Sequence, residues 1–256
     1  MNSIEKKLLE LNKIEDIQQR SHWMNSLHPL GKLLISVIYI LCVTSFDKYD
    51  IVHLILMSVY IIFTFAIGEL SFKEGIYRMR LILPLLIFVG IFNPFLDKNI
   101  VLIAGYEVRG GIVSMLTLVV KGVYTVLAVY ALIATTPIDD ICYALRIIKI
   151  PKIIVIVIML IYRYIDVMSK EADRIFTSYR LRAPGQKGIA YKYWGALVGQ
   201  WLLRSMDRAQ IVYESMTLRG FRGDFIPSKK SVRALDVIYP IVWIAIFMII
   251  RFAVTG

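Results

Sequence analysis

Two short arginine motifs are the most informative features of this sequence. The first reads Tyr-Arg-Leu-Arg-Ala-Pro-Gly over residues 179–185, and the second reads Ser-Met-Thr-Leu-Arg-Gly-Phe-Arg-Gly over residues 215–223. Each ends a run with the periodicity of an amphipathic helix, and glycine or proline follows at once, so the arginines are expected at helix C-termini. A guanidinium there complements the helix dipole, but it can also bond a partner's carboxylates with defined geometry. Two such ends predict a pair of contact points for a soluble partner.

The sequence lacks the common catalytic and ligand-binding patterns. It has no Gly-x4-Gly-Lys-Ser/Thr phosphate loop and no Gly-x-Ser-x-Gly nucleophile motif. The three histidines form no metal-binding pair, and the two cysteines have no partner at metal or redox spacing. Asp139 and Asp140 follow Thr-Thr-Pro, where acids complement the dipole at a helix start, a metal-binding carboxylate pair being the alternative. We therefore expect no catalytic residue, no metal site and no cofactor.

The composition predicts a membrane protein with several crossings. Of the 256 residues 58% are hydrophobic, and six apolar runs cover 30–46, 51–68, 81–96, 111–134, 153–168 and 234–250. A full crossing needs about 20 apolar residues, with about 17 as the minimum. The runs at 81–96 and 153–168 are therefore marginal on length alone.

The location of the positive charge predicts the orientation. Residues 170–234 hold 13 Lys and Arg against 5 Asp and Glu, which is +8 of the net +11. Basic loops stay in the cytosol. Nucleic-acid binding is the other explanation of such charge, but the surplus flanks membrane helices, so no nucleic acid is expected. The charges fit best if 153–168 does not cross, with the N-terminus inside and Gly256 outside.

The run at 153–168 is thus interpreted as part of a cytosolic helix. Arg163 and Asp166 interrupt its second half, and a charged residue at mid-bilayer costs at least about 2.5 kcal/mol. We expect one long helix over about 152–182 and a second over about 191–219. The fold class is therefore all-α: a polytopic membrane protein with about five transmembrane helices plus long cytosolic amphipathic helices. Its predicted parts are 1–134 with four crossings, a cytosolic region over 135–233, and a last crossing within 234–256.

Two further features concern contacts between helices. Gly195 and Gly199 form a small-xxx-small step, which predicts a crossing point of the two long helices, with lipid-facing glycines as the alternative. Lys121 is interpreted as the one clear charge within a spanning run. An intramembrane lysine is a functional candidate, but it can equally snorkel or pair with a carbonyl inside the bundle.

The sequence resembles the transmembrane T component (EcfT/CbiQ family) of energy-coupling factor (ECF) transporters, in particular the cobalt-transport type. The resemblance covers most of the chain. Leu-His-Pro-Leu-Gly-Lys-Leu over 27–33 is similar to the family's entry to the first span, and its central signature is matched over 135–152 and 160–164. The two arginine motifs are similar to the family's coupling motifs, in which small residues flank an arginine.

The resemblance implies which residues couple the chain to its partners. Arg182 and Arg219 match the coupling arginines at the tips of two crossing cytosolic helices, with Arg180 as the alternative in the first motif. The residues that complete the two motifs are Leu181, Ala183, Leu218 and Gly220. The sequence departs from the family in having leucine before each arginine, where alanine is common.

The resemblance also implies the role of the chain. It would be a non-catalytic coupling subunit of an ATP-driven importer in the bacterial plasma membrane, with the N-terminus cytosolic. The implied partners are two ATP-binding-cassette ATPase subunits, a separate substrate-binding membrane subunit and the lipid bilayer. Cobalt is the first-ranked substrate, followed by nickel and a vitamin. A lipid-metabolism enzyme would need acidic residues or histidines converging at the membrane face, and a secondary transporter would need internal repeats; the sequence shows neither.

Overall fold

The computed structural model describes residues 18, 23–80, 82–97, 100–103, 106–186, 188–223 and 233–252. It divides into two compact units, with boundaries after Ile141 and after Ser228. The bundle unit comprises the described residues up to Ile141 together with 233–252, and the helix-pair unit comprises those from Cys142 to 223. The sequence placed these boundaries at 134 and 233. Each unit is described by itself.

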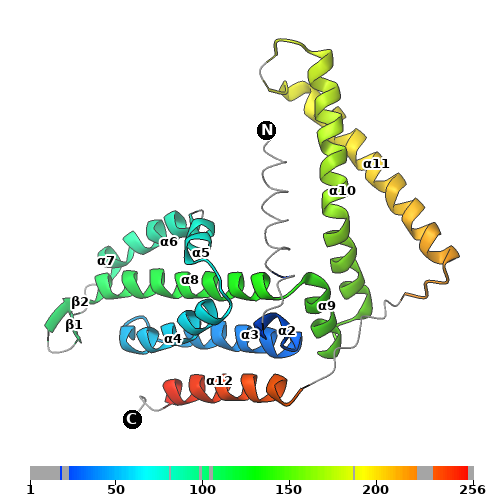
Figure 1. The fold of residues 1–256 in the computed structure, drawn as a ribbon. Helices are drawn as coiled ribbons and strands as arrows, with labels where there is room; N and C mark the ends of the chain where they lie inside the picture. Colours follow the sequence, from blue (N-terminus) through cyan, green and yellow to red (C-terminus); the bar gives the residue numbers. More distant parts are fainter. Residues whose placement is uncertain are drawn as a thin grey trace. The chain divides into compact units, whose positions relative to one another are not determined.

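The bundle unit consists of helices and one short hairpin. Four of its helices run alongside one another, α3, α4, α8 and α12, with α8 in contact with α3 and α4, and α12 with the same two helices (Figure 1). In chain order the elements are α2 (Trp23–Ser26), α3 (Pro29–Ser45), α4 (Ile51–Ile67), α5 (Phe72–Met79), α6 (Ile82–Ile91), α7 (Asn93–Leu96), β1 (Ile100–Ile103), β2 (Tyr106–Arg109), α8 (Gly110–Thr135), the first residues of α9 (Ile138–Ile147), and α12 (Ala234–Phe252).

The apolar helices confirm a polytopic membrane protein of the all-α class. In the described part of the chain α8 and α12 are long and apolar enough to span a membrane, and α5 with the following apolar helix, bent by 58°, can supply a third span. The helices α3 and α4 are apolar but only 17 residues long, at the lower limit for a crossing. These are the five segments in which crossings were predicted, and the number and direction of the crossings stay predictions.

The core of the bundle joins its first and last apolar helices. On α3, Ile35, Tyr39 and Val43 recur every four residues and are fully buried, as expected for one face of a helix. On α12, Trp243 and Phe247 form the matching face, and the rings of Tyr39 and Phe247 lie 5.4 Å apart. Between membrane helices, close van der Waals packing of such side chains drives association, so α12 is held to α3 although the whole helix-pair unit separates them in sequence.

One element of the bundle was not predicted. The strands β1 and β2 pair in antiparallel register from Ile100 opposite Arg109 to Ile103 opposite Tyr106. The run Ile-Val-Leu-Ile in β1 is rich in β-branched residues and too short for a helix. At the start of α8, a Cβ on Gly111 would lie 2.5 Å from the Cα of Pro94, so only glycine allows α7 and α8 to approach this closely.

The helix-pair unit contains the two long helices that the sequence predicted, α10 (Lys152–Arg182) and α11 (Tyr191–Leu218). They run antiparallel, since the ring centroids of Phe176 and Trp194 lie 6.3 Å apart while the Trp201 indole donates to the Met168 carbonyl at 3.2 Å. Among the described helices α10 is not one that is long and apolar enough to span a membrane, because charged residues interrupt its apolar half. Before it, α9 carries two aspartates in its first turn, as the dipole interpretation expects.

Candidate functional site

The first arginine motif forms the C-terminal end of α10. Arg180 and Arg182 lie in its last turn, and both are exposed. The last helical residue is Arg182, and Ala183 is the C-cap. The helix cannot continue through Ala183 because Pro184 disfavours helical backbone in the residue before it. Pro184 and Gly185 (φ 85°) form the centre of a turn, closed by a hydrogen bond of 3.3 Å from the next N–H to the Ala183 carbonyl. Proline followed by a glycine with positive φ is typical of a type II turn.

The second arginine motif ends α11 in a different way. Arg219 is the C-cap residue, and Gly220 follows with a φ of 77°. The N–H of Gly220 donates to the Thr217 carbonyl at 2.9 Å, and the N–H of Phe221 donates to the Met216 carbonyl at 3.0 Å. This pair of bonds is a Schellman motif, which satisfies the last carbonyls of the helix with backbone donors. The helix end therefore does not need the Arg219 guanidinium for capping.

An exposed leucine precedes each arginine. Leu181 is 78% exposed and Leu218 is 89% exposed. Arg182 and Arg219 are exposed beside them, and within the described residues neither guanidinium makes an ion pair. A guanidinium next to an apolar side chain offers a partner both charge and contact area. Each helix end thus has the composition of a small protein-binding site.

The two ends cannot enter one pocket of a partner. The first lies at the turn that leads into α11, and the second lies at the far end of α11. An α-helix rises 1.5 Å per residue, so the 28 residues of α11 place the ends about 42 Å apart. They are therefore two separate sites.

A polar contact joins α10 to α11 midway along the pair. The carboxylate of Glu171 accepts hydrogen bonds from Arg204 on α11 and, at 3.3 Å, from Arg174 on α10. The hydrogen bond from Arg204, with further help from Arg174, holds the pKa of the Glu171 carboxyl below its ordinary value. The Glu171–Arg204 ion pair crosses between the helices, and it helps to set how they lie against each other.

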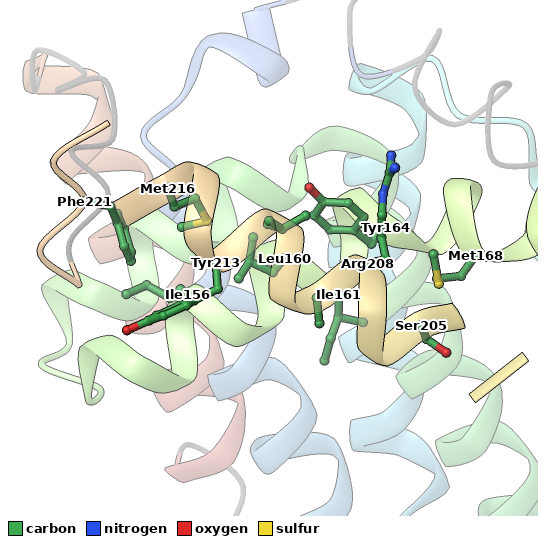
Figure 2. Close-up of a pocket in the computed structure, with 12 residues that line it drawn as sticks. Ile156, Leu160, Ile161, Tyr164, Met168, Ser205, Arg208, Tyr213, Met216 and Phe221 are labelled. Carbon is green, nitrogen blue, oxygen red and sulfur yellow. The ribbon is translucent and has the colours of Figure 1, made fainter. Parts of the chain in front are cut away.

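An apolar groove lies between α10 and α11, nearer the end of α11 that carries Arg219. Its volume is about 420 Å³. Figure 2 shows that side chains of α10 and α11 face each other across it, and that Phe221 from the Schellman motif lies at its end. The side chains that line it include Ile156, Leu160, Tyr164, Met216 and Phe221.

The predicted crossing point at Gly195 and Gly199 is not where α10 and α11 meet. Apart from the neighbouring residues of α11 itself, no atom of the described residues lies within 4 Å of the position that a Cβ would take on either glycine. Large side chains on another face of α11 make the contact instead, among them Trp194, Trp201 and Arg204. Because the two glycines are four residues apart, they share one helix face, and among the described residues no atom covers that face at the two glycines.

Lys121 pairs with main-chain carbonyls in the structure, which is one of the three alternatives that the sequence left open. Its ammonium donates to the carbonyls of Phe46 and, at 3.4 Å, Thr44 at the C-terminal end of α3. Arg251 of α12 approaches the same end and donates to the Ser45 hydroxyl at 3.3 Å. Two cations therefore complement the negative end of the α3 dipole.

Lys121 is not the only charge in an apolar run, since Lys32 and Asp236 lie within the bundle at the opposite end of α3. Both are buried, with exposures of 5% and 8%. Neither buried charge was predicted from the sequence, although Lys32 falls in the 27–33 motif. The signal that could have found Lys32 is its position inside the apolar run 30–46, where a charged side chain needs a polar partner or access to the interface. Among the described residues, no group of three or more His, Cys, Asp or Glu could hold a metal ion.

Comparison with known proteins agrees with this architecture. The chain is 26% identical over 189 residues to the uncharacterized protein MJ1089 of Methanocaldococcus jannaschii, covering 73% of this chain and 61% of that protein. It is 26% identical over 94 residues to the nickel permease LarQ of Lactiplantibacillus plantarum, covering 37% of this chain and 34% of LarQ. The chain thus spans less than two thirds of the length of these relatives.

The family match is broader than either relative. The model of the cobalt transport protein CbiQ matches residues 20–232. That range contains α3 to α11 and both arginine motifs. The chain therefore belongs to the CbiQ cobalt transport protein family, whose members are membrane components of transporters.

Proposed function

We propose that this chain is the coupling subunit of an ECF-type importer of a divalent transition metal. Two ATPase subunits dock on the Arg182 and Arg219 ends, and a separate membrane subunit binds the substrate. The observation that carries the proposal is the pair of exposed arginine–leucine helix ends about 42 Å apart on one antiparallel helix pair. Two remote, similar ends suit two copies of a partner better than one.

The chemistry of the ends suits docking into an acidic cleft. A guanidinium forms bidentate hydrogen bonds with carboxylates, and it is weakly hydrated enough to enter an interface. The Schellman motif leaves the Arg219 side chain available, while Leu218 adds apolar area beside it. In the first motif Arg182 is the last helical residue, and Arg180 is its alternative one half-turn earlier.

The helix pair can transmit a movement of its two arginine ends along its length. α10 and α11 have 31 and 28 residues, and the Glu171–Arg204 contact ties them together between their ends. Closure of two ATPases on nucleotide would move the two ends together, and a stiff pair would shift as one element with two positions. The membrane substrate subunit would respond to that shift.

The substrate follows from the family and from a relative. Cobalt is the first candidate because the matching model describes cobalt transport, and nickel is the second because one relative is named a nickel permease. A coupling subunit need not touch the ion, so its own residues carry little information on this choice. We place the chain in the bacterial plasma membrane, with its N-terminus and helix pair in the cytosol.

The decisive test is a double charge reversal, Arg182→Glu with Arg219→Glu. An acidic cleft would then meet the wrong charge, and loss of one hydrogen-bonded interfacial charge alone typically costs about 2–5 kcal/mol. We expect the chain to fold in the membrane but to lose co-purification of the ATPases and ATP-driven Co²⁺ uptake. The control reverses Lys229 and Lys230, which lie outside the described residues and outside both motifs.

Two results would contradict this proposal. Normal ATP-dependent uptake by the double variant would mean that the arginines serve only as part of a general basic surface. An equal loss of uptake when Lys229 and Lys230 are reversed in charge would lead to the same conclusion. Single alanine substitutions at Arg180 and Arg182, compared in the same assay, decide which arginine of the first motif docks.

A further inference from the structure

A buried polar cluster lies where the C-terminal end of α8 meets the N-terminal ends of α3 and α12 (Figure 1). The Lys32 ammonium donates to the carbonyl of Thr135, the last residue of α8, at 2.8 Å. The Asp236 carboxylate accepts the N–H of His28, the N-cap of α3, at 2.8 Å through Oδ1. Its Oδ2 accepts the N–H of Arg233, directly before α12, at 2.8 Å. One carboxylate therefore caps the N-termini of two helices.

These hydrogen bonds are significant because of where the bonded residues lie along the chain. The helix pair lies in the segment inserted between α8 and α12. Thr135, the last residue of α8, is bonded to Lys32, and Arg233, directly before α12, is bonded through Asp236 to His28. The residues on either side of the inserted segment are thus both bonded to the first turn of α3.

The joint is close-packed as well as polar. A Cβ on Gly31 would lie 3.3 Å from the Asp236 carbonyl oxygen and 3.5 Å from the Pro240 ring, so the backbones of α3 and α12 approach closely here. Charge-assisted hydrogen bonds are stronger and more directional than neutral ones. Apolar residues would stabilise such a site about as well. Buried charged groups add a defined geometry, which a joint that must move as one piece requires.

We infer that Lys32 and Asp236 are positioning residues that carry the displacement of the helix pair into the membrane bundle, by holding the residues on either side of the inserted segment on the first turn of α3. This inference rests on the proposed coupling function. It predicts a specific defect. If the joint is loosened, docked ATPases still hydrolyse ATP, because the arginine ends belong to the other unit, but their motion no longer reaches the bundle efficiently.

The test measures coupling in the complete complex. The chain is purified with its ATPase and substrate-binding subunits and reconstituted in proteoliposomes, and ATP hydrolysis is measured together with uptake of Co²⁺ or Ni²⁺. The variants are Lys32→Met, which keeps side-chain length without the charge, and Asp236→Asn, which cannot accept both N–H groups with carboxylate oxygens. The matched control is Lys121→Met, because Lys121 also donates to main-chain carbonyls, at the opposite end of α3.

We expect both variants to retain ATP hydrolysis, while the metal taken up per ATP falls at least about tenfold, the factor by which an equilibrium changes when one hydrogen bond to a charged group is lost. The control should keep the wild-type ratio. A wild-type ratio in Lys32→Met and Asp236→Asn, or an equal fall in Lys121→Met, would overturn the inference. Loss of assembly in both variants would overturn it too, since the role would then be structural only. A wild-type complex that hydrolyses ATP without uptake would instead count against the proposed function.

Discussion

The left-handed residue Gly220 allows a sharp test of how the Arg219 end is held in place. Its φ of 77° lies in the region that glycine adopts freely and that residues with a Cβ avoid. Apart from its chain neighbours, no described residue has an atom within 4 Å of the position that a Cβ would take there. Substitution there therefore introduces backbone strain without a steric clash, so the effect of conformation alone can be measured.

The magnitude follows from the backbone preference. Left-handed helical backbone costs an L-residue roughly 1–2 kcal/mol, and asparagine tolerates it better than alanine or valine. The Schellman motif needs this conformation, so strain of that size lowers the population of the capped end by a factor of about 5–30 at most. The apparent affinity of an ATPase for the Arg219 end should fall by up to the same factor, because only the capped end presents the arginine correctly. We expect the loss of ATPase affinity to be smallest for Gly220→Asn, larger for Gly220→Ala and largest for Gly220→Val.

The assay is a binding titration of purified ATPase subunit against the purified membrane protein in detergent. Gly199→Ala is the matched control, since it adds the same methyl group to α11 at a site that is equally open but has no positive φ. Helix propensity alone would make that change neutral or slightly stabilising. Wild-type affinity in Gly220→Val, or a loss in Gly199→Ala as large as that in Gly220→Ala, would refute the reasoning.

Two other predictions concern the helix pair and the topology. Glu171→Gln should weaken the α10–α11 contact and reduce uptake more than ATPase binding. Because the pKa of Glu171 is lowered from 4.5 by Arg204 and Arg174, its stabilising contribution is present above about pH 4.5 and is lost as the pH falls through the lower folded value. Thermal unfolding of wild type and variant should therefore converge in acid, and a difference that stays constant as the pH is lowered from 4.5 would contradict this. A cysteine placed at Ile148, in a chain whose own two cysteines are replaced, should react with impermeant reagent only in inverted vesicles. Labelling in intact cells would overturn the five-crossing topology.

The features that depend on local interactions could be predicted from the sequence alone. The 3.6-residue periodicity and the Ala-Pro-Gly break predicted the two long helices almost to the residue, because Pro184 ends a helix wherever the fold places it. Gly220 after Arg219 likewise indicated a helix end, and the Schellman motif is formed within a few residues of chain. The five apolar segments followed from hydrophobicity, a property of each segment alone. The hairpin β1–β2 was missed because short apolar runs do not show which secondary structure they adopt.

The contacts between residues of different helices could not be predicted without the three-dimensional structure. The step at Gly195 and Gly199 predicted a crossing point, but bulky side chains on another face of α11 make the contact, and helix periodicity cannot show which face finds a neighbour. Lys121 and Lys32 are both lysines in apolar runs, yet one complements the C-terminal end of α3 and the other is bonded to the end of α8. Asp236 lies far from His28 in sequence, so no local pattern could reveal that its carboxylate caps the N-termini of both α3 and α12. These contacts exist because packing of the apolar faces brings distant helix ends together, and that packing is a property of the whole bundle.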